Sequence, residues 1–141
     1  MQNKSFHYAA LITGLALIAV CFMPWVHYNS IDKTFSGYNV TQFATGVYYG
    51  KAGIIITGFS TLILIFNLLK GTVAKNANLF VCALLVAYTF RTYILFTGSL
   101  FEGQVVKYAG IYLIVILSIV LLVCALFPLT AGKQKTAEKR Q

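Results

Sequence analysis

Apolar residues gather in four long runs along the chain, and polar residues are largely confined to the stretches between the runs. The runs cover about residues 8–27, 51–70, 77–98 and 108–129. Because a bilayer core about 30 Å thick needs roughly 20 apolar residues per helix, each run is long enough to cross a membrane. The pattern predicts an all-α membrane protein, in which a four-transmembrane-helix bundle forms a single domain over residues 1–131.

The composition strengthens the membrane prediction. Of 141 residues, 59% are hydrophobic and only 10% are charged, with a mean hydropathy of +0.79, whereas soluble domains carry about 25% charged residues. Four crossings use most of the chain length, which leaves no room for a separate soluble catalytic domain. We therefore expect a multi-pass protein of a plasma membrane, and a bacterial inner membrane is favoured.

The longest connection, residues 28–50, follows the first run shortly after Pro24-Trp25. Proline tends to end a helix and tryptophan prefers the level of the lipid headgroups, so this pair predicts the point where the chain leaves the bilayer. Anchoring at this interface is the favoured role of Trp25 and His27, and contact with a ligand is the alternative. The loop is rich in β-formers that loosely alternate with other residues, which favours a short β-hairpin.

The basic residues predict the orientation of the bundle. If both termini are cytoplasmic, the inner set comprises Lys4, Lys70, Lys75, Lys133, Lys135, Lys139 and Arg140. The smaller outer set then comprises Lys33, Lys51, Arg91 and Lys107. This bias agrees with the positive-inside rule, so we expect cytoplasmic termini and an outer loop at residues 28–50. Residues 132–141 are predicted to form a basic, disordered cytoplasmic tail.

Several classes of function are disfavoured by the charged residues. The net charge of +8 does not indicate a nucleic-acid partner, because the basic residues lie in short loops and tails, where they act as topology signals and hold anionic headgroups. The only carboxylates belong to Asp32, Glu102 and Glu138, so no serine–histidine–acid set can be assembled and we expect no enzyme. His7 and His27 are expected at opposite membrane faces, which predicts no metal site, and no cofactor is indicated.

Arg91 is the one charged residue inside an apolar run, and it stands among the hydroxyl groups of Tyr88, Thr92 and Tyr93. In one interpretation it is a structural clasp that pairs with an acidic residue of an outer loop. In the other it faces a partner or an anionic ligand, because ionisable residues within a membrane are functional candidates. Our candidates for ligand or partner contact are Arg91, Tyr88, Tyr93, Glu102, Trp25, His27, Phe35, Tyr38 and Phe43.

Small residues within or beside the apolar runs predict close contacts between helices. Such residues let two backbones approach each other in a membrane bundle. The candidates are Ala10 and Gly14 on the first run, Gly46 and Gly50 before the second, and Gly53 and Gly58 within it.

Two resemblances concern the layout of the chain. A larger outer loop between helices one and two resembles the claudin and peripheral-myelin-protein superfamily, but the loop from Val26 to Gly50 has neither the cysteine pair nor the tryptophan of that family. Pro24-Trp25, Ser36-Gly37 and Gly50-Lys51-Ala52-Gly53 are more similar to a group of small bacterial four-helix membrane proteins. This likeness covers about a third of the chain and implies a membrane location without implying an activity.

These observations predict a non-enzymatic integral membrane interaction protein. It would be an accessory subunit of a larger membrane complex or a homo-oligomer, so its partners would be the lipid bilayer and either other membrane subunits or itself. The outer loop and the region of Arg91 would form the recognition surface. The alternative is a small transporter or pore-forming oligomer, with a path near Arg91 that favours anions.

Overall fold

The structure is a computed structural model that describes residues 2–29, 32–38, 52–69, 71–98 and 105–138. Within these residues the chain forms four helices and three short strands. The helices are α1 (Gln2–Val20), α2 (Ala52–Leu68), α3 (Thr72–Thr97) and α4 (Ala109–Glu138). The strands are β1 (Pro24–Tyr28), β2 (Lys33–Ser36) and β3 (Val105–Lys107).

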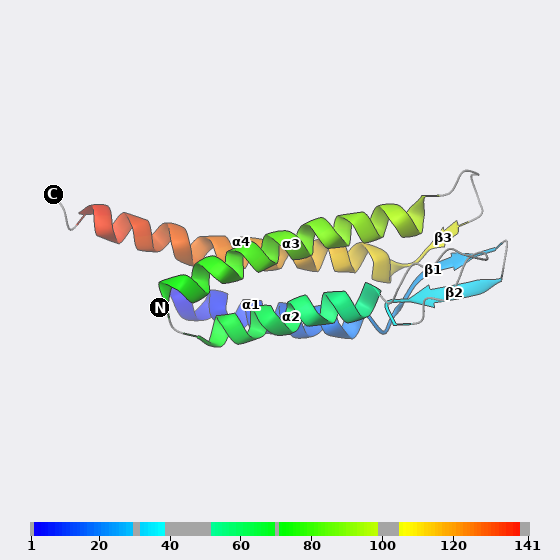
Figure 1. The fold of residues 1–141 in the computed structure, drawn as a ribbon, viewed down its shortest axis with the longest axis horizontal. Helices are drawn as coiled ribbons and strands as arrows, with labels where there is room; N and C mark the ends of the chain where they lie inside the picture. The colour runs from blue at the N-terminus through cyan, green and yellow to red at the C-terminus, as the bar shows by residue number, and fades with distance from the viewer. Residues whose placement is uncertain (1, 30–31, 39–51, 70, 99–104, 139–141) are drawn as a thin grey trace.

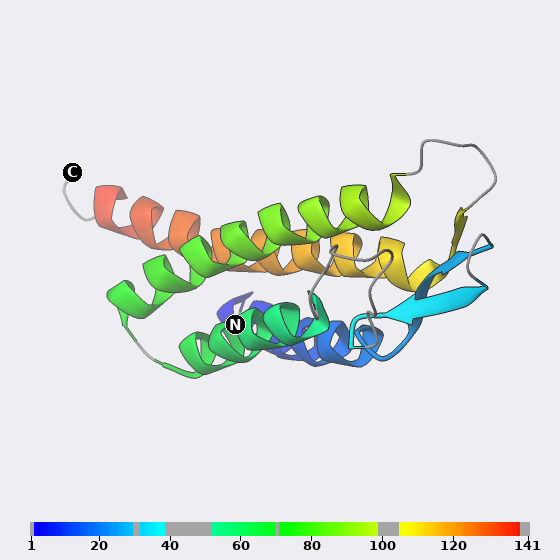
Figure 2. The same ribbon diagram turned by 45° about the vertical axis from the view of Figure 1, so that its right-hand side comes forward.

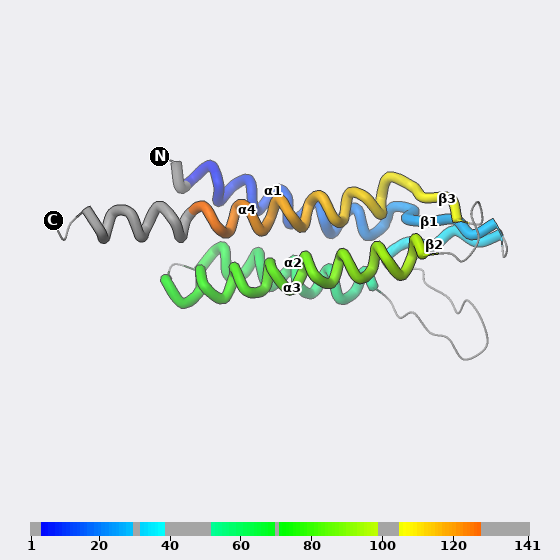
Figure 3. Tube along the Cα trace, turned by 90° about the horizontal axis from the view of Figure 1, so that it is seen from above, coloured from blue at the N-terminus to red at the C-terminus, as the bar shows by residue number. Residues whose placement is uncertain are grey.

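The four helices run alternately up and down and form an antiparallel bundle (Figure 1). Each helix packs against the helices next to it in the sequence, and α1 also packs against α4, which closes the ring. In a view from above, α1 and α4 form one layer and α2 and α3 form the other (Figure 3). Both chain termini lie at one end of the bundle and the strands lie at the other (Figures 1 and 2).

The three strands form one antiparallel sheet in the order β2-β1-β3, which we call the cap. His27 in the central strand lies opposite Thr34 of β2 and Val106 of β3. The pairing of β1 with β2 is irregular between Pro24 and Val26, at the position of Trp25. Asp32, in the connection between β1 and β2, has a φ of 49°, and a short polar side chain of this kind tolerates the left-handed region in tight turns.

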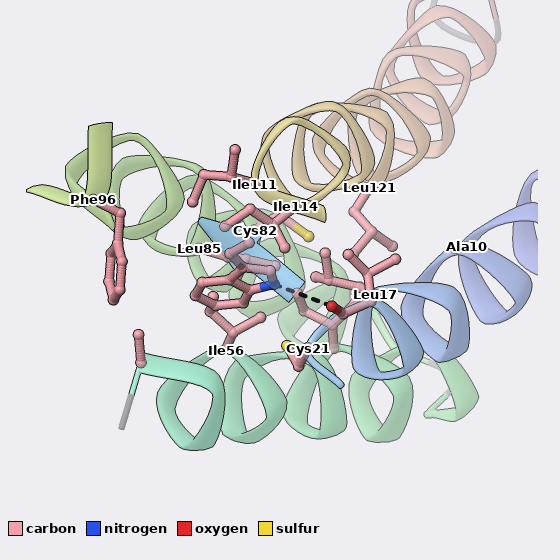
Figure 4. Close-up of a cluster of buried hydrophobic side chains, with 14 of the residues drawn as sticks. Ala10, Leu17, Cys21, Ile56, Cys82, Leu85, Phe96, Ile111, Ile114 and Leu121 are labelled. Atoms are coloured by element: carbon pink, nitrogen blue, oxygen red, sulfur yellow. Dashed lines mark hydrogen bonds between the residues drawn. The ribbon is translucent and has the colours of Figure 1, made fainter. Parts of the chain in front are cut away.

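The core extends from the centre of the bundle to the underside of the cap. Leu17, Ile56, Leu85 and Ile114 supply one buried side chain from each helix (Figure 4). A buried polar contact joins α3 to α4, where the Thr89 and Ser118 hydroxyl oxygens lie 2.9 Å apart.

The structure corrects the predicted end of the first helix. We expected this helix over residues 8–27, but α1 ends at Val20 and residues 24–28 form the central strand of the cap. Pro24 lacks the backbone donor that a helix interior needs, and the β-branched and aromatic residues after it suit a strand. We predicted a hairpin within residues 28–50, but the hairpin of the structure pairs β2 with β1, which belongs to the expected helix, and β3 was not predicted. The fold is therefore mostly helical with a small sheet, not all-α.

α2 lies within the predicted run 51–70 and α4 begins within one residue of the predicted start, but α3 begins at Thr72 and not at residue 77, so most of the predicted turn before it is helical. α4 continues to Glu138, so residues 132–138 are helical where we predicted a disordered tail. Ala, Lys, Gln and Glu dominate this segment and are good helix formers, which explains the extension. Two helices are long and apolar enough to cross a membrane: α3, with a mean hydropathy of 1.9, and α4 over Ala109–Phe127, with 3.0. α2 and the Lys4–Val20 part of α1 are apolar but shorter.

Candidate functional site

Trp25 lies in the core between the cap and the helices, with none of its surface exposed. Its indole Nε1 donates a hydrogen bond to the Val20 carbonyl oxygen at 3.1 Å (Figure 4, dashed line). Its ring meets that of Phe96 edge to face, with the centroids 5.8 Å apart. The expectations of an interface anchor and of a ligand contact are both wrong for Trp25, because β1 turns back over the bundle end and buries the indole.

Glycines make room for the buried Trp25. A Cβ atom at Gly37 would lie 2.8 Å from both the Cys21 carbonyl oxygen and the indole ring, and one at Gly110 would lie 2.6 Å from the Pro24 carbonyl oxygen. A Cβ atom at Gly53 would lie 2.6 Å from the Gly37 carbonyl carbon. The Gly53 amide donates to the Gly37 carbonyl oxygen at 2.7 Å. Gly53 thus packs against the backbone after β2, whereas we had expected it in a contact between helices.

The candidates Phe35 and Tyr38 hold the cap against the bundle together with Tyr28, which was not among the candidates. The Tyr28 hydroxyl donates to the Phe96 carbonyl oxygen at 2.9 Å, and the Tyr38 hydroxyl is hydrogen-bonded to Thr57 on α2. Phe35 is buried, with its ring centroid 5.7 Å from that of Tyr28. These side chains are therefore occupied within the protein.

His27 is half-buried within the cap and contacts two polar residues of the hairpin. Its Nδ1 lies 2.8 Å from the Thr34 hydroxyl oxygen, and its Nε2 lies 3.6 Å from a carboxylate oxygen of the exposed Asp32. Asp32 therefore faces His27, and no ion pair joins it to Arg91 in the part of the chain that the structure describes.

Arg91 lies on the outward face of α3 and is exposed. Its guanidinium forms no hydrogen bond and no ion pair with any described residue. The residues above and below it on this face are exposed and apolar, at alternating spacings of four and three. We call this surface the outer stripe; it comprises Phe80, Leu84, Ala87, Arg91 and Ile94.

The tyrosines near Arg91 in the sequence pack their rings against the neighbouring helices. Tyr88 is half-buried and its ring contacts Phe59 of α2, with the centroids 6.4 Å apart. Tyr93 is also half-buried and contacts Tyr112 of α4 at 5.8 Å. Beside it, a small apolar notch of about 210 Å³ lies between α3 and α4. Both tyrosine rings are therefore used in packing between helices, and Thr92 donates to the Tyr88 carbonyl oxygen.

The predicted packing residues have different environments. Ala10 is buried, and a Cβ atom at Gly14 would lie 3.0 Å from Leu64, so α1 and α2 approach closely there. Gly58 is exposed, with nothing near the position of a Cβ atom. The candidates Glu102, Phe43, Gly46 and Gly50 lie outside the described residues.

A further feature was not predicted from the sequence. A cavity at the end of the bundle that carries the termini is lined by residues from all four helices, including Lys4, Lys75 and Asn78. Asn78 is the one asparagine or glutamine within the third apolar run, residues 77–98, a signal that could have directed attention to this end.

No protein-family model, no curated protein and no solved structure matches the chain. Among the described residues, no three His, Cys, Asp or Glu side chains come together in a way that could hold a metal ion.

Proposed function

We propose that the chain is a four-span integral membrane protein and serves as an accessory subunit. It binds one transmembrane helix of a partner protein along the outer stripe of α3. The observation that carries this proposal is Arg91, a permanent cation that is exposed on an apolar face and has no counter-charge among the described residues.

Four crossings are supported by the apolar surface of the bundle. Each helix exposes large apolar side chains, among them Ile12 on α1, Ile65 on α2, Ile94 on α3 and Ile116 on α4. Soluble monomers rarely expose contiguous apolar patches of this extent. The 17 residues of α2 rise only about 26 Å, but α1 and α2 pack beside α3 and α4. A membrane that surrounds α3 and α4 would therefore surround all four helices.

The position of Arg91 favours a partner that carries a carboxylate. Arg91 lies six residues before the end of α3, about 9 Å along the helix axis. An arginine at the bilayer centre costs about 2.5–3.5 kcal/mol, and less toward the interface, so part of this cost remains while the guanidinium faces lipid. An Asp or Glu on a neighbouring helix would offset it through a charge-assisted hydrogen bond.

The outer stripe also has a suitable shape for a helix. Alternating spacings of four and three are typical of the seam along which two helices pack. Ala87 lies one turn before Arg91 in this stripe, and its small side chain would let a partner backbone approach. The charge and the spacing thus favour the same kind of occupant.

A second copy of this chain is a poorer occupant of the stripe. The chain has three acidic residues: Asp32 lies in the connection between β1 and β2, Glu138 is the last residue of α4, and Glu102 lies outside the described residues. Two α3 stripes facing each other would oppose arginine to arginine without a carboxylate, and like charges disfavour such a pairing. We therefore favour a different polypeptide over a homo-oligomer.

The alternative of an anion path has less support. Arg91 lies on the outside of the bundle, whereas the middle of the described interior holds packed side chains that are mostly apolar, such as Leu17 and Leu85. Such a path would have to run between copies of the chain.

The test is gentle extraction from the native membrane, followed by native mass spectrometry of the wild type, Arg91→Leu and the control Lys107→Gln. Lys107 is an exposed cation of the cap. A second polypeptide at fixed ratio is expected with the wild type and the control and is lost with Arg91→Leu, while the isolated bundle keeps its Tm. Retention of the partner by Arg91→Leu, or masses that are only multiples of 15.6 kDa, would refute the proposal.

A further inference from the structure

The end of the bundle that carries both termini, opposite the cap, contains a cavity of about 720 Å³. We call it the terminal cavity. Ligand pockets typically cover about 300–1,000 Å³, so it is large enough for a molecule of substantial size. Residues of α1, α2, α3 and α4 line it, which places it on the axis of the bundle and apart from the outer stripe.

The mouth of the terminal cavity is positively charged. Lys4 of α1 and Lys75 of α3 line it and are exposed, and the lining residues include no Asp or Glu. Gly71, at the N-cap of α3, also lines it and leaves the helix start without a side-chain cap. The free amide groups and the positive dipole end of a helix N-terminus attract anions. Together these groups would hold a phosphate.

Inside the mouth, Asn78 offers a polar group without a partner. Only 8% of this residue is exposed, and its Oδ1 atom accepts no hydrogen bond within the described residues. A buried acceptor left unsatisfied is costly, and few native groups remain in that state. A ligand that carries a hydroxyl group beside its phosphate would donate the missing hydrogen bond.

Most of the remaining lining residues are apolar, and two polar ones, His7 and Asn67, join two helices in the wall. Ile63, Phe66 and Leu121 contribute apolar side chains from α2 and α4. His7 and Asn67 join α1 to α2 through two contacts, one of 3.2 Å between Nδ1 and Oδ1 and one of 3.3 Å from the Asn67 amide to the His7 carbonyl oxygen. An apolar lining behind a cationic mouth suits an amphiphile.

We infer that the terminal cavity binds one anionic phospholipid whose head group carries hydroxyls. Its phosphate lies between Lys4, Lys75 and the start of α3. A head-group hydroxyl donates to Asn78, and the first part of an acyl chain contacts the apolar lining. This inference rests on the membrane location proposed above but not on the partner helix, so loss of partner binding by Arg91→Leu would leave it intact.

The test uses the full chain, purified in mild detergent and titrated in native mass spectrometry with phosphatidylglycerol or phosphatidylcholine of equal acyl chains. One phosphatidylglycerol per chain is expected to bind at least tenfold more tightly than phosphatidylcholine. The double variant Lys4→Gln/Lys75→Gln should lower the affinity for phosphatidylglycerol roughly tenfold to thirtyfold, because two lysines that attract the anionic lipid are lost. The matched control is Lys33→Gln, which removes an exposed lysine from the cap and should leave binding unchanged.

Asn78→Leu provides a second readout that a purely structural role would not produce. Because the leucine removes an unsatisfied buried acceptor while keeping a similar volume, the Tm should stay level or rise. Phosphatidylglycerol binding should fall at the same time. Equal binding of both lipids, or unchanged phosphatidylglycerol binding in the double variant, would overturn the inference. Competition by free glycerol phosphate at the concentration of the lipid would also overturn it, since a soluble anion would then be the ligand.

Discussion

The close contact between α2 and the backbone after β2 can be tested with two glycines of one helix. Gly53 and Gly58 both lie in α2, and replacement of either by alanine adds the same methyl group. A Cβ atom at Gly53 would lie 2.6–2.9 Å from three backbone atoms of Gly37, whereas one at Gly58 meets nothing within 4 Å. The two variants therefore differ mainly in steric contact.

The expected free energies have opposite signs. Alanine in a helix is favoured over glycine by about 0.5–1 kcal/mol, so Gly58→Ala should keep or slightly raise the stability. At Gly53 the added methyl group overpacks the site, at a cost of about 1–3 kcal/mol. It also threatens the 2.7 Å hydrogen bond from the Gly53 amide to Gly37, which contributes about 0.5–1.5 kcal/mol. We expect the two variants to differ by about 2–4 kcal/mol.

Thermal unfolding in mild detergent measures this difference. For a chain of this size 1 kcal/mol corresponds to roughly 3–4 °C in Tm, so Gly53→Ala should melt about 10 °C below Gly58→Ala. Trp25 is the one tryptophan of the chain and lies under the cap, so its fluorescence reports on the cap while circular dichroism reports on the helices. Equal melting temperatures of the two variants would refute the close contact between Gly53 and Gly37.

Two further predictions concern orientation and helix packing. Two single variants, Lys33→Cys in the cap and Lys75→Cys near the termini, are treated with a maleimide that does not cross membranes. It should label only Lys33→Cys in intact cells and both variants after permeabilisation. The native cysteines are buried, which keeps their labelling low. Labelling of both sites in intact cells would refute the crossing topology. A double-mutant cycle of Thr89→Val and Ser118→Ala should give a coupling of about 0.6 kcal/mol in the free energy of unfolding, as is typical of side-chain hydrogen bonds in membranes. A coupling of zero would show that this hydrogen bond does not stabilise the contact between α3 and α4.

The number of helices, the range of α2 and the start of α4 could be predicted from the sequence, because long apolar runs determine them. The end of α1 could not, since Trp25 and Val26 are apolar and continue the run although they form a strand. Hydrophobicity alone does not separate a buried strand from a buried helix. β3 has three residues and pairs with β1, which is far away in the sequence, so no local pattern predicts it.

The roles of individual residues were harder to predict, because they depend on which way each side chain faces. Trp25 matched the usual preference for the membrane interface, and the space that buries it is made by Gly37 and Gly110, which are far apart in the sequence. The orientation of Arg91 was likewise hidden, because α3 has apolar residues on every side and the sequence does not mark one face as outer. Only the packing of α3 against α2 and α4 shows that Arg91 points away from the bundle.

Most polar groups of the described helices have a partner within the protein, and a few have none. This difference supports both the proposed partner helix at Arg91 and the proposed lipid at Asn78. Thr92 donates to a carbonyl oxygen of its own helix, and Thr89 and Ser118 contact each other, so these hydroxyls have structural roles. Arg91 and the Asn78 carbonyl oxygen have no partner among the described residues. Local violations of the folding pattern are expected at functional sites, and each of these two lies where a ligand could reach it. The buried Ser60 hydroxyl also lacks a described partner, but no described cavity reaches it, so it carries no such proposal.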